Sequence, residues 1–188
     1  MRPVAREEIV DYATYEDGRE AFRERVLAAK RVRRVHLGEY LTLLFENALT
    51  VRYQVQEMIR VERIVREADI RHEIDTYNEL LGGDGELGCT LMIEIDDPAD
   101  RAVKLRDWFG LPEHLYLLLP DGRRVRPHVD ERQRDDERIS SVHYLKFAVG
   151  REAPVAAGCD LAGLVVEARL TDEQRRALAE DLGTEQPA

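Results

Sequence analysis

A stripe of mostly apolar residues between Tyr40 and Val65 is the feature of this sequence that most constrains its fold. No Pro or Gly lies between Glu39 and Leu81. The members of the stripe follow one another at steps of three and four residues, the spacing of one face of an α-helix. They are Tyr40, Leu44, Asn47, Val51, Val55, Met58, Glu62 and Val65. The pattern predicts a long central helix over Gly38–Asp69, followed by a bend and a helical continuation to Leu81.

Glu62 interrupts this stripe with a carboxylate. A carboxylate buried alone would cost several kcal/mol, so we expect Glu62 to be paired, protonated or bound to a cation. Arg33 continues the apolar stripe of the preceding helix and could meet Glu62, and Arg66 follows Glu62 by four residues. We therefore predict a buried polar network made of Arg33, Asn47, Glu57, Arg60 and Glu62.

The remaining sequence predicts an α+β fold in one domain, 1–188. A helical part (about 15–81) precedes a sheet part (about 87–182), with the long helix packed on an antiparallel sheet. A helix is predicted over Tyr15–Val32, and the dipeptide Asp97-Pro98 begins another. Strands are predicted at Leu87–Ile95, Leu115–Leu119, Arg123–Val129, Ile139–Val149 and Leu161–Arg169. The turn Pro120-Asp121-Gly122 predicts that the second and third of these strands form a hairpin.

The last part of the chain carries its own local signals. Thr171 and Gln174 form a capping box for a C-terminal helix over Asp172–Leu182. Ala156–Asp160 resembles a turn, which would leave Cys159 more exposed than Cys89, a predicted core residue. We expect Asp130–Arg138 to be a solvated loop and Gly183–Ala188 to fray.

The composition narrows the classes of partner. With 38 acidic and 28 basic side chains, the formal net charge is −10, which disfavours general affinity for nucleic acid. No apolar run is long enough to span a bilayer, and the N-terminus lacks a signal-peptide pattern. We therefore expect a cytoplasmic protein.

A metal site is one alternative interpretation of the acids. Glu62, Glu94 and His143 could together bind iron, manganese or zinc, since carboxylate and imidazole ligands suit these ions. The usual Glu-x-x-His pattern of helical di-iron proteins is absent from the sequence. His143 shares a strand face with Leu145 and Phe147, so it is expected to point inward as a core residue or as a ligand.

Five basic residues lie within seven positions: Lys30, Arg31, Arg33, Arg34 and His36. The cluster could bind a phosphate, a nucleotide or an acidic partner. Alternatively, it only reflects the preference for cations at a helix C-terminus. As a partner surface it would expose Lys30, Arg31 and Arg34, while Arg33 would turn into the core.

Several segments resemble an uncharacterised bacterial domain of unknown function: Arg33–Val35, Leu41–Asn47, Gln54–Arg60 with Glu62–Ile64, Glu73–Asn78, Cys89–Glu94 and Ser141–Leu145. The resemblance covers nearly the whole chain and is looser from Gly150 onward. It implies no established activity. Genes of this family tend to lie beside those of a rubrerythrin and an iron–sulfur oxidoreductase, which implies a redox or peroxide-response setting and those two proteins as partners.

Two functional hypotheses follow. The leading one is a non-catalytic accessory or interaction protein in a bacterial redox system, because the sequence contains no recognisable catalytic or phosphate-binding motif. The alternative is a metal- or cofactor-binding redox protein that uses buried carboxylates and His143.

Overall fold

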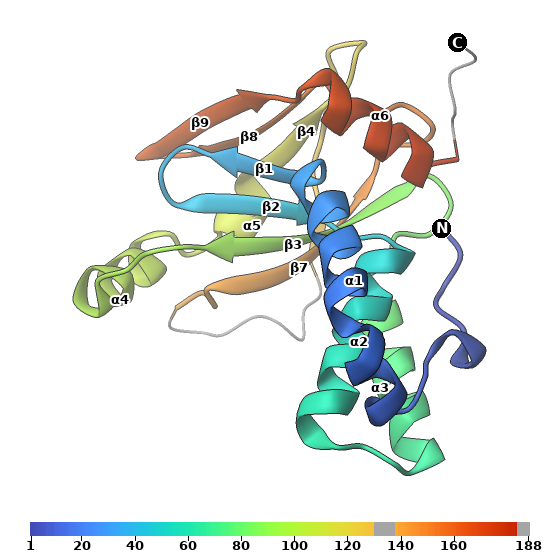
Figure 1. Ribbon diagram of the computed structural model, residues 1–188. Coiled ribbons are helices and arrows are strands. Elements are labelled where there is room, and N and C mark those ends of the chain that lie inside the picture. The colour runs from blue at the N-terminus through green and yellow to red at the C-terminus, as the bar shows by residue number, and fades with distance from the viewer. Residues whose placement is uncertain (130–137, 184–188) are drawn as a thin grey trace.

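The computed structural model describes residues 1–129 and 138–183, and within these ranges the strands form two antiparallel sheets (Figure 1). The first has the order β1 (Arg34–Leu37), β2 (Leu41–Phe45), β3 (Glu86–Ile93), β7 (Val142–Ala148) and β6 (His128–Val129). The second has the order β5 (Arg124–Val125), β4 (Leu115–Leu118), β8 (Ala156–Leu161) and β9 (Leu164–Arg169).

The helices lie around these sheets and beside them. They are η1 (Arg6–Glu8), α1 (Tyr12–Arg31), α2 (Ala48–Glu62), α3 (Glu67–Asn78), α4 (Pro98–Asp107), α5 (Leu111–His114) and α6 (Asp172–Asp181). Figure 1 shows α1, α2 and α3 as a group that extends away from the sheets, with α4 and α6 at opposite ends of the sheet region. Helices hold 42% of the residues and strands 25%, so the predicted α+β class is confirmed.

The main core lies between the two sheets. Alternate residues along each strand point to one face, and those of the first sheet include Leu43, Leu91 and Leu145. They belong to one buried cluster with Leu117 and Cys159 of the second sheet. This shared apolar face holds the two sheets together.

A second core lies among the helices. Val51, Val55 and Ile59 of α2 are fully buried and pack with Ile70 and Ile74 of α3. The N-terminal segment joins this cluster through Val4 and Ile9. The Asn78 side chain fixes it there, because it accepts from the Val4 N–H (2.9 Å) and donates to the Val4 carbonyl (3.0 Å).

The prediction of one long helix over Gly38–Asp69 is wrong. Residues 34–45 form β1 and β2, and α2 begins only after Asn47, whose side chain accepts the Thr50 N–H at 3.0 Å. The helix ends at Glu62, because Arg63 adopts a left-handed conformation with φ 52°. All five residues of β2 are buried, so the strand lacks the polar alternation that would distinguish it from a helix.

A second difference concerns Ala156–Asp160, which lies in strand β8 instead of a turn. A Cβ atom at Gly158 would lie 2.4 Å from the Tyr116 ring, so the glycine lets the two strands pack closely. Cys159 is 0% exposed, and the prediction that it is the more exposed cysteine is wrong. Burial raises the pKa of both cysteine thiols.

Other local predictions match the structure. The hairpin of β4 and β5, the helix after Asp97 and the capped helix α6 are all present. The predicted strand Arg123–Val129 is instead two short strands, β5 and β6, which belong to different sheets. Positions 130–137 of the predicted solvated loop and 184–188 of the predicted fraying tail lie outside the described residues. Among the described helices, none combines the length and apolar character needed to cross a bilayer.

Candidate functional site

The basic cluster lies where α1 ends and β1 begins. Arg31 and Arg34 are exposed and Lys30 is half-buried, with its ammonium group 5.5 Å from the centre of the Tyr53 ring. Arg33 is buried. The junction therefore turns one cation inward and leaves three facing outward; we call Lys30, Arg31 and Arg34 the basic surface.

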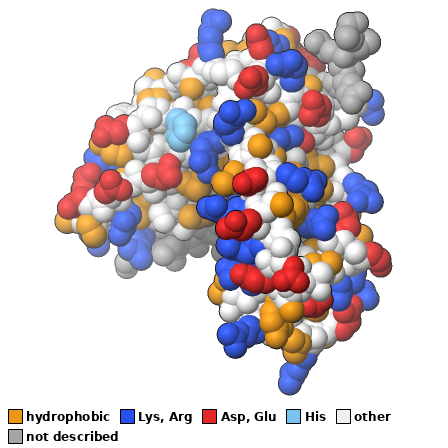
Figure 2. Space-filling model, viewed as in Figure 1, with side chains coloured by type: hydrophobic (Ala, Val, Ile, Leu, Met, Phe, Trp, Pro, Cys, Tyr) orange, Lys and Arg blue, Asp and Glu red, His pale blue; other side chains and the backbone are white. Residues whose placement is uncertain are grey.

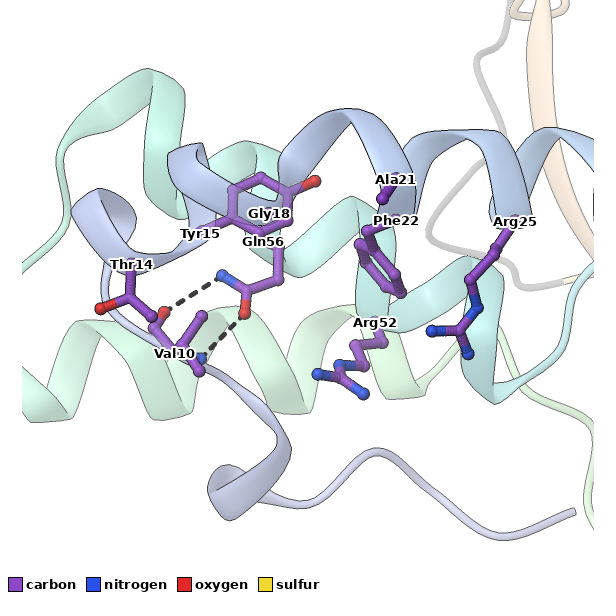
Figure 3. A pocket seen from close by; sticks show the side chains of 9 residues that line it. All are labelled: Val10, Thr14, Tyr15, Gly18, Ala21, Phe22, Arg25, Arg52 and Gln56. Carbon is purple, nitrogen blue, oxygen red and sulfur yellow. Dashed lines mark hydrogen bonds between the residues drawn. The ribbon is translucent and has the colours of Figure 1, made fainter.

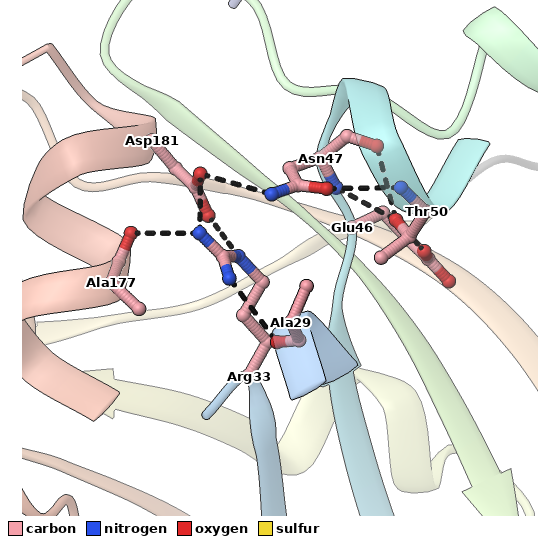
Figure 4. A network of polar contacts seen from close by, with 7 residues as sticks. All are labelled: Ala29, Arg33, Glu46, Asn47, Thr50, Ala177 and Asp181. Atoms are coloured by element: carbon pink, nitrogen blue, oxygen red, sulfur yellow. Dashed lines mark hydrogen bonds and ion pairs between the residues drawn. The ribbon is translucent and has the colours of Figure 1, made fainter. Parts of the chain in front are cut away.

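A buried ion pair anchors this junction (Figure 4). The Arg33 guanidinium binds Asp181 of α6 through both nitrogens of one edge: Nε to Oδ2 at 2.7 Å and Nη2 to Oδ1 at 3.0 Å. Each side chain is only 8% exposed. Such two-point geometry fixes the orientation of both groups.

Further hydrogen bonds complete the anchor. Arg33 Nη1 donates to the Ala29 carbonyl at 3.1 Å, and Asn47 Nδ2 donates to Asp181 Oδ1 at 3.4 Å. Gln174 of α6 donates through Nε2 to the Arg34 carbonyl at 2.7 Å. Helix α6 thus holds the backbone and the inward arginine of the junction, which fixes the direction of its neighbours.

The basic surface is electrostatically uncompensated. Among the residues that the structure describes, Lys30, Arg31 and Arg34 form no ion pair with Asp or Glu. Leu27, one turn before Arg31, is 49% exposed. Figure 2 shows Lys and Arg side chains gathered around the end of α1 next to the sheets. This arrangement suits contact with an acidic partner surface that would also cover Leu27.

Glu62 does not take part in a buried network. It is exposed at the last position of α2, and neither Arg33 nor Arg66 forms an ion pair with it. The prediction that placed Glu62 in the core is wrong because α2 ends at Glu62, and the residues that α2 buries include Val55 and Ile59 but not Glu62. The buried carboxylate is instead Glu46, 2% exposed, which accepts from the Thr50 and Thr90 hydroxyls at 2.5 and 2.8 Å.

Glu57 and Arg60 belong to a separate network that joins α1 to α2. Glu57 accepts from Arg19 Nε (2.7 Å) and Nη2 (3.0 Å), from the Tyr15 hydroxyl (2.7 Å) and from Arg60 Nη2 (3.1 Å). Burial would raise the pKa of Glu57, but the hydrogen bonds from Arg19, Tyr15 and Arg60 outweigh it and hold the pKa at about 2. The predicted five-residue network is thus two separate networks. Arg33 and Asn47 belong to one and Glu57 and Arg60 to the other, while Glu62 belongs to neither.

The three candidate metal ligands do not converge. His143 is 3% exposed and pairs across the sheet with Leu91, on the face that points to the main core. Glu94 is exposed and accepts from the Thr42 hydroxyl, which also contacts His36 Nδ1 at 2.9 Å, on the opposite face. Glu62 lies at the end of α2. Nowhere in residues 1–129 or 138–183 do three or more His, Cys, Asp or Glu side chains form a group that could hold a metal ion.

His143 is therefore a core histidine. Burial lowers its pKa below the ordinary value, which favours the neutral ring at pH 7. Its ring nitrogens are buried without a well-formed hydrogen bond to the described residues. The Ser140 backbone acts on the pKa of the ring in the opposite direction to burial, but burial dominates.

Sequence reasoning did not identify the partners of these groups. Asp181 lies 148 residues from Arg33, and Arg19 lies 38 residues from Glu57. Periodicity reports only which face of an element a residue occupies, so it cannot pair residues across the fold.

Comparison with known proteins identifies the family of this chain and assigns it no activity. A family model described as a protein of unknown function (DUF3501) matches residues 3–182, and the chain belongs to this family. The chain is also similar to a solved structure, a novel protein of unknown function from Burkholderia pseudomallei K96243. The two are 30% identical with a TM-score of 0.89, and the match covers 96% of this chain and 100% of the other. No curated protein matches the chain.

Proposed function

We propose that this chain is a non-catalytic accessory protein that docks an acidic partner protein through the basic surface Lys30, Arg31 and Arg34. The observation that supports the proposal is a set of outward cations, without ion-pair partners among the described residues, in a chain of net charge −10. Uncompensated charge on one face steers an oppositely charged partner and fixes its orientation.

The rigid support beneath the surface favours this proposal over a simple helix-end effect. A helix C-terminus attracts cations without a need to fix their direction. Here the Arg33–Asp181 pair and the Gln174–Arg34 hydrogen bond restrict the backbone that carries the cations. A preformed binding surface loses less conformational entropy on association.

A redox setting is the finer part of the proposal. It rests on the gene neighbourhood implied by the family resemblance, which makes the iron–sulfur oxidoreductase and the rubrerythrin the first partners to test. In this role the chain supplies a docking surface, and the partner supplies the metal chemistry.

The experiment compares two triple charge reversals. The first replaces Lys30, Arg31 and Arg34 by Glu, and the control replaces the exposed Arg63, Arg66 and Arg71 by Glu. Both change the net charge equally, and the control also breaks the exposed Arg71–Glu67 ion pair. We expect the first variant to associate on the order of tenfold more slowly at low salt, and the control to stay close to wild type.

The difference should shrink at high salt, because mobile ions screen exposed charges. Association is measured by stopped flow or surface plasmon resonance with each purified partner, and circular dichroism verifies that both variants are folded. If both variants associate equally slowly, net charge alone explains the effect. If the basic-surface variant associates as fast as wild type, the basic surface is not the docking site.

A further inference from the structure

A groove of about 280 Å³ lies between α1, α2 and the N-terminal segment (Figure 3). It is on a different part of α1 from the basic surface. Its lining includes Thr14, Gly18, Ala21 and Phe22 of α1. Ligand sites in proteins are concave, mostly apolar and provided with a few polar groups, and this groove has that composition.

Two arginines line the groove, Arg25 from α1 and Arg52 from α2. Within the described part of the chain neither forms an ion pair. The Arg52 guanidinium lies 5.2 Å from the centre of the Phe22 ring, a cation–π contact that orients it. Its Nε is buried and makes no hydrogen bond to the described residues. Because Nε is shielded from solvent, an anion in the groove would reach the two Nη groups at the end of the side chain instead.

Gly18 keeps the groove open. It lies in the interior of α1, where glycine is less favourable than alanine. A Cβ atom at this position would meet nothing within 4 Å, and its φ is not positive. Neither close packing nor backbone geometry therefore requires a glycine here. The open space in front of Gly18 is part of the groove itself.

The wall on the N-terminal side is fixed by hydrogen bonds. The Val10 N–H donates to Gln56 Oε1 at 2.8 Å, and Gln56 Nε2 donates back to the Val10 carbonyl at 3.1 Å (Figure 3). Gln56 is 1% exposed, so both of these bonds are shielded from water. The groove is thus preformed between two helices and a fixed strap, which lowers the entropic cost of binding.

We propose that this groove binds a small organic anion, with its oxyanion group between Arg25 and Arg52 and its apolar part against Phe22 and Val10. Guanidinium groups bind carboxylate and phosphate oxygens at two points, so the shared chemistry is a planar or tetrahedral oxyanion. The volume limits the ligand to a small molecule. The proposal does not depend on the docking function, because the two sites use different residues.

The test is a titration of the purified full-length chain with phenyl phosphate and with benzoate in separate arms, followed by amide NMR shifts in a buffer free of other oxyanions. We expect saturable binding in at least one arm, and the stronger arm distinguishes phosphate from carboxylate. Inorganic phosphate should bind more weakly than phenyl phosphate, since it leaves Phe22 and Val10 uncovered.

Variants assign the binding to the groove. Arg52→Gln and Arg25→Gln should each weaken binding about tenfold, the effect of losing a charge-assisted hydrogen-bonding group. Gly18→Leu should block the groove with both arginines intact, and it keeps the proposal testable if Arg52→Gln fails to fold. The matched control Arg23→Gln removes an exposed arginine outside the groove and should leave affinity unchanged.

Absence of saturable binding in both arms would overturn the proposal. Binding that Gly18→Leu leaves unchanged would also overturn it, because the anion would then sit elsewhere.

Discussion

Asp181→Ala is expected to lower the free energy of unfolding by about 3–5 kcal/mol, the cost of leaving one member of a buried ion pair without its partner. The Arg33 side chain is 8% exposed and takes two hydrogen bonds to Asp181. Without the carboxylate, the guanidinium keeps only backbone carbonyls at 3.1 and 3.5 Å. Urea unfolding at pH 7 measures the change.

The matched control is Asp172→Ala at the other end of α6. That carboxylate is 94% exposed and its contact with Arg175 is 4.0 Å long, so its loss should change stability by less than about 1 kcal/mol. The double variant Arg33→Met/Asp181→Leu removes both charges, so its free energy of unfolding should fall by less than that of Asp181→Ala. A wild-type unfolding curve for Asp181→Ala would mean that Arg33 is solvated.

Glu57→Gln is expected to lower the free energy of unfolding by roughly 3 kcal/mol at pH 7, from a pKa near 2 in the folded chain against an ordinary value of 4.5. The side chain is 20% exposed, so solvent screening is limited. Because folding lowers this pKa, the stabilisation is complete above pH 4.5. It is lost as the pH falls toward 2.

The difference in free energy of unfolding between wild type and Glu57→Gln should therefore narrow as the pH falls from 5 to 2. Unfolding by urea across this range measures it. Glu62→Gln serves as the control, since Glu62 is an exposed carboxylate on the same helix and its loss should cost less than about 0.5 kcal/mol. A gap that stays constant with pH would show that the ionised carboxylate does not stabilise the fold.

The fold class followed from local signals that the structure retains. The Asp97-Pro98 start of α4, the Thr171–Gln174 capping box and the Pro120-Asp121-Gly122 turn each depend on neighbouring residues only. The helical phase of α1 also predicted that Arg33 turns inward beside outward Lys30, Arg31 and Arg34. Caps and turns could be predicted because the residues that form them are close together in the sequence.

The central part of the fold could not be predicted in the same way. Leu41–Phe45 is apolar except for Thr42, and all five residues are buried, so the run fits a helix or a strand. The boundary depended on Asn47, whose capping role is visible only once the strand before it is known. The same misplaced boundary left the buried Glu46 unrecognised, and Asp181 was missed because it lies 148 residues from Arg33.

Hydrogen exchange of the full chain with and without its acidic partner tests the docking proposal most directly. Once the association measurements have identified a partner that the triple charge reversal weakens, amide exchange by mass spectrometry maps the contact. We expect new protection in the segment that joins α1 to β1, from Leu27 to His36, together with the facing part of α6 around Gln174. Protection confined to other segments, such as the turn between α2 and α3, would contradict the docking surface proposed for this protein.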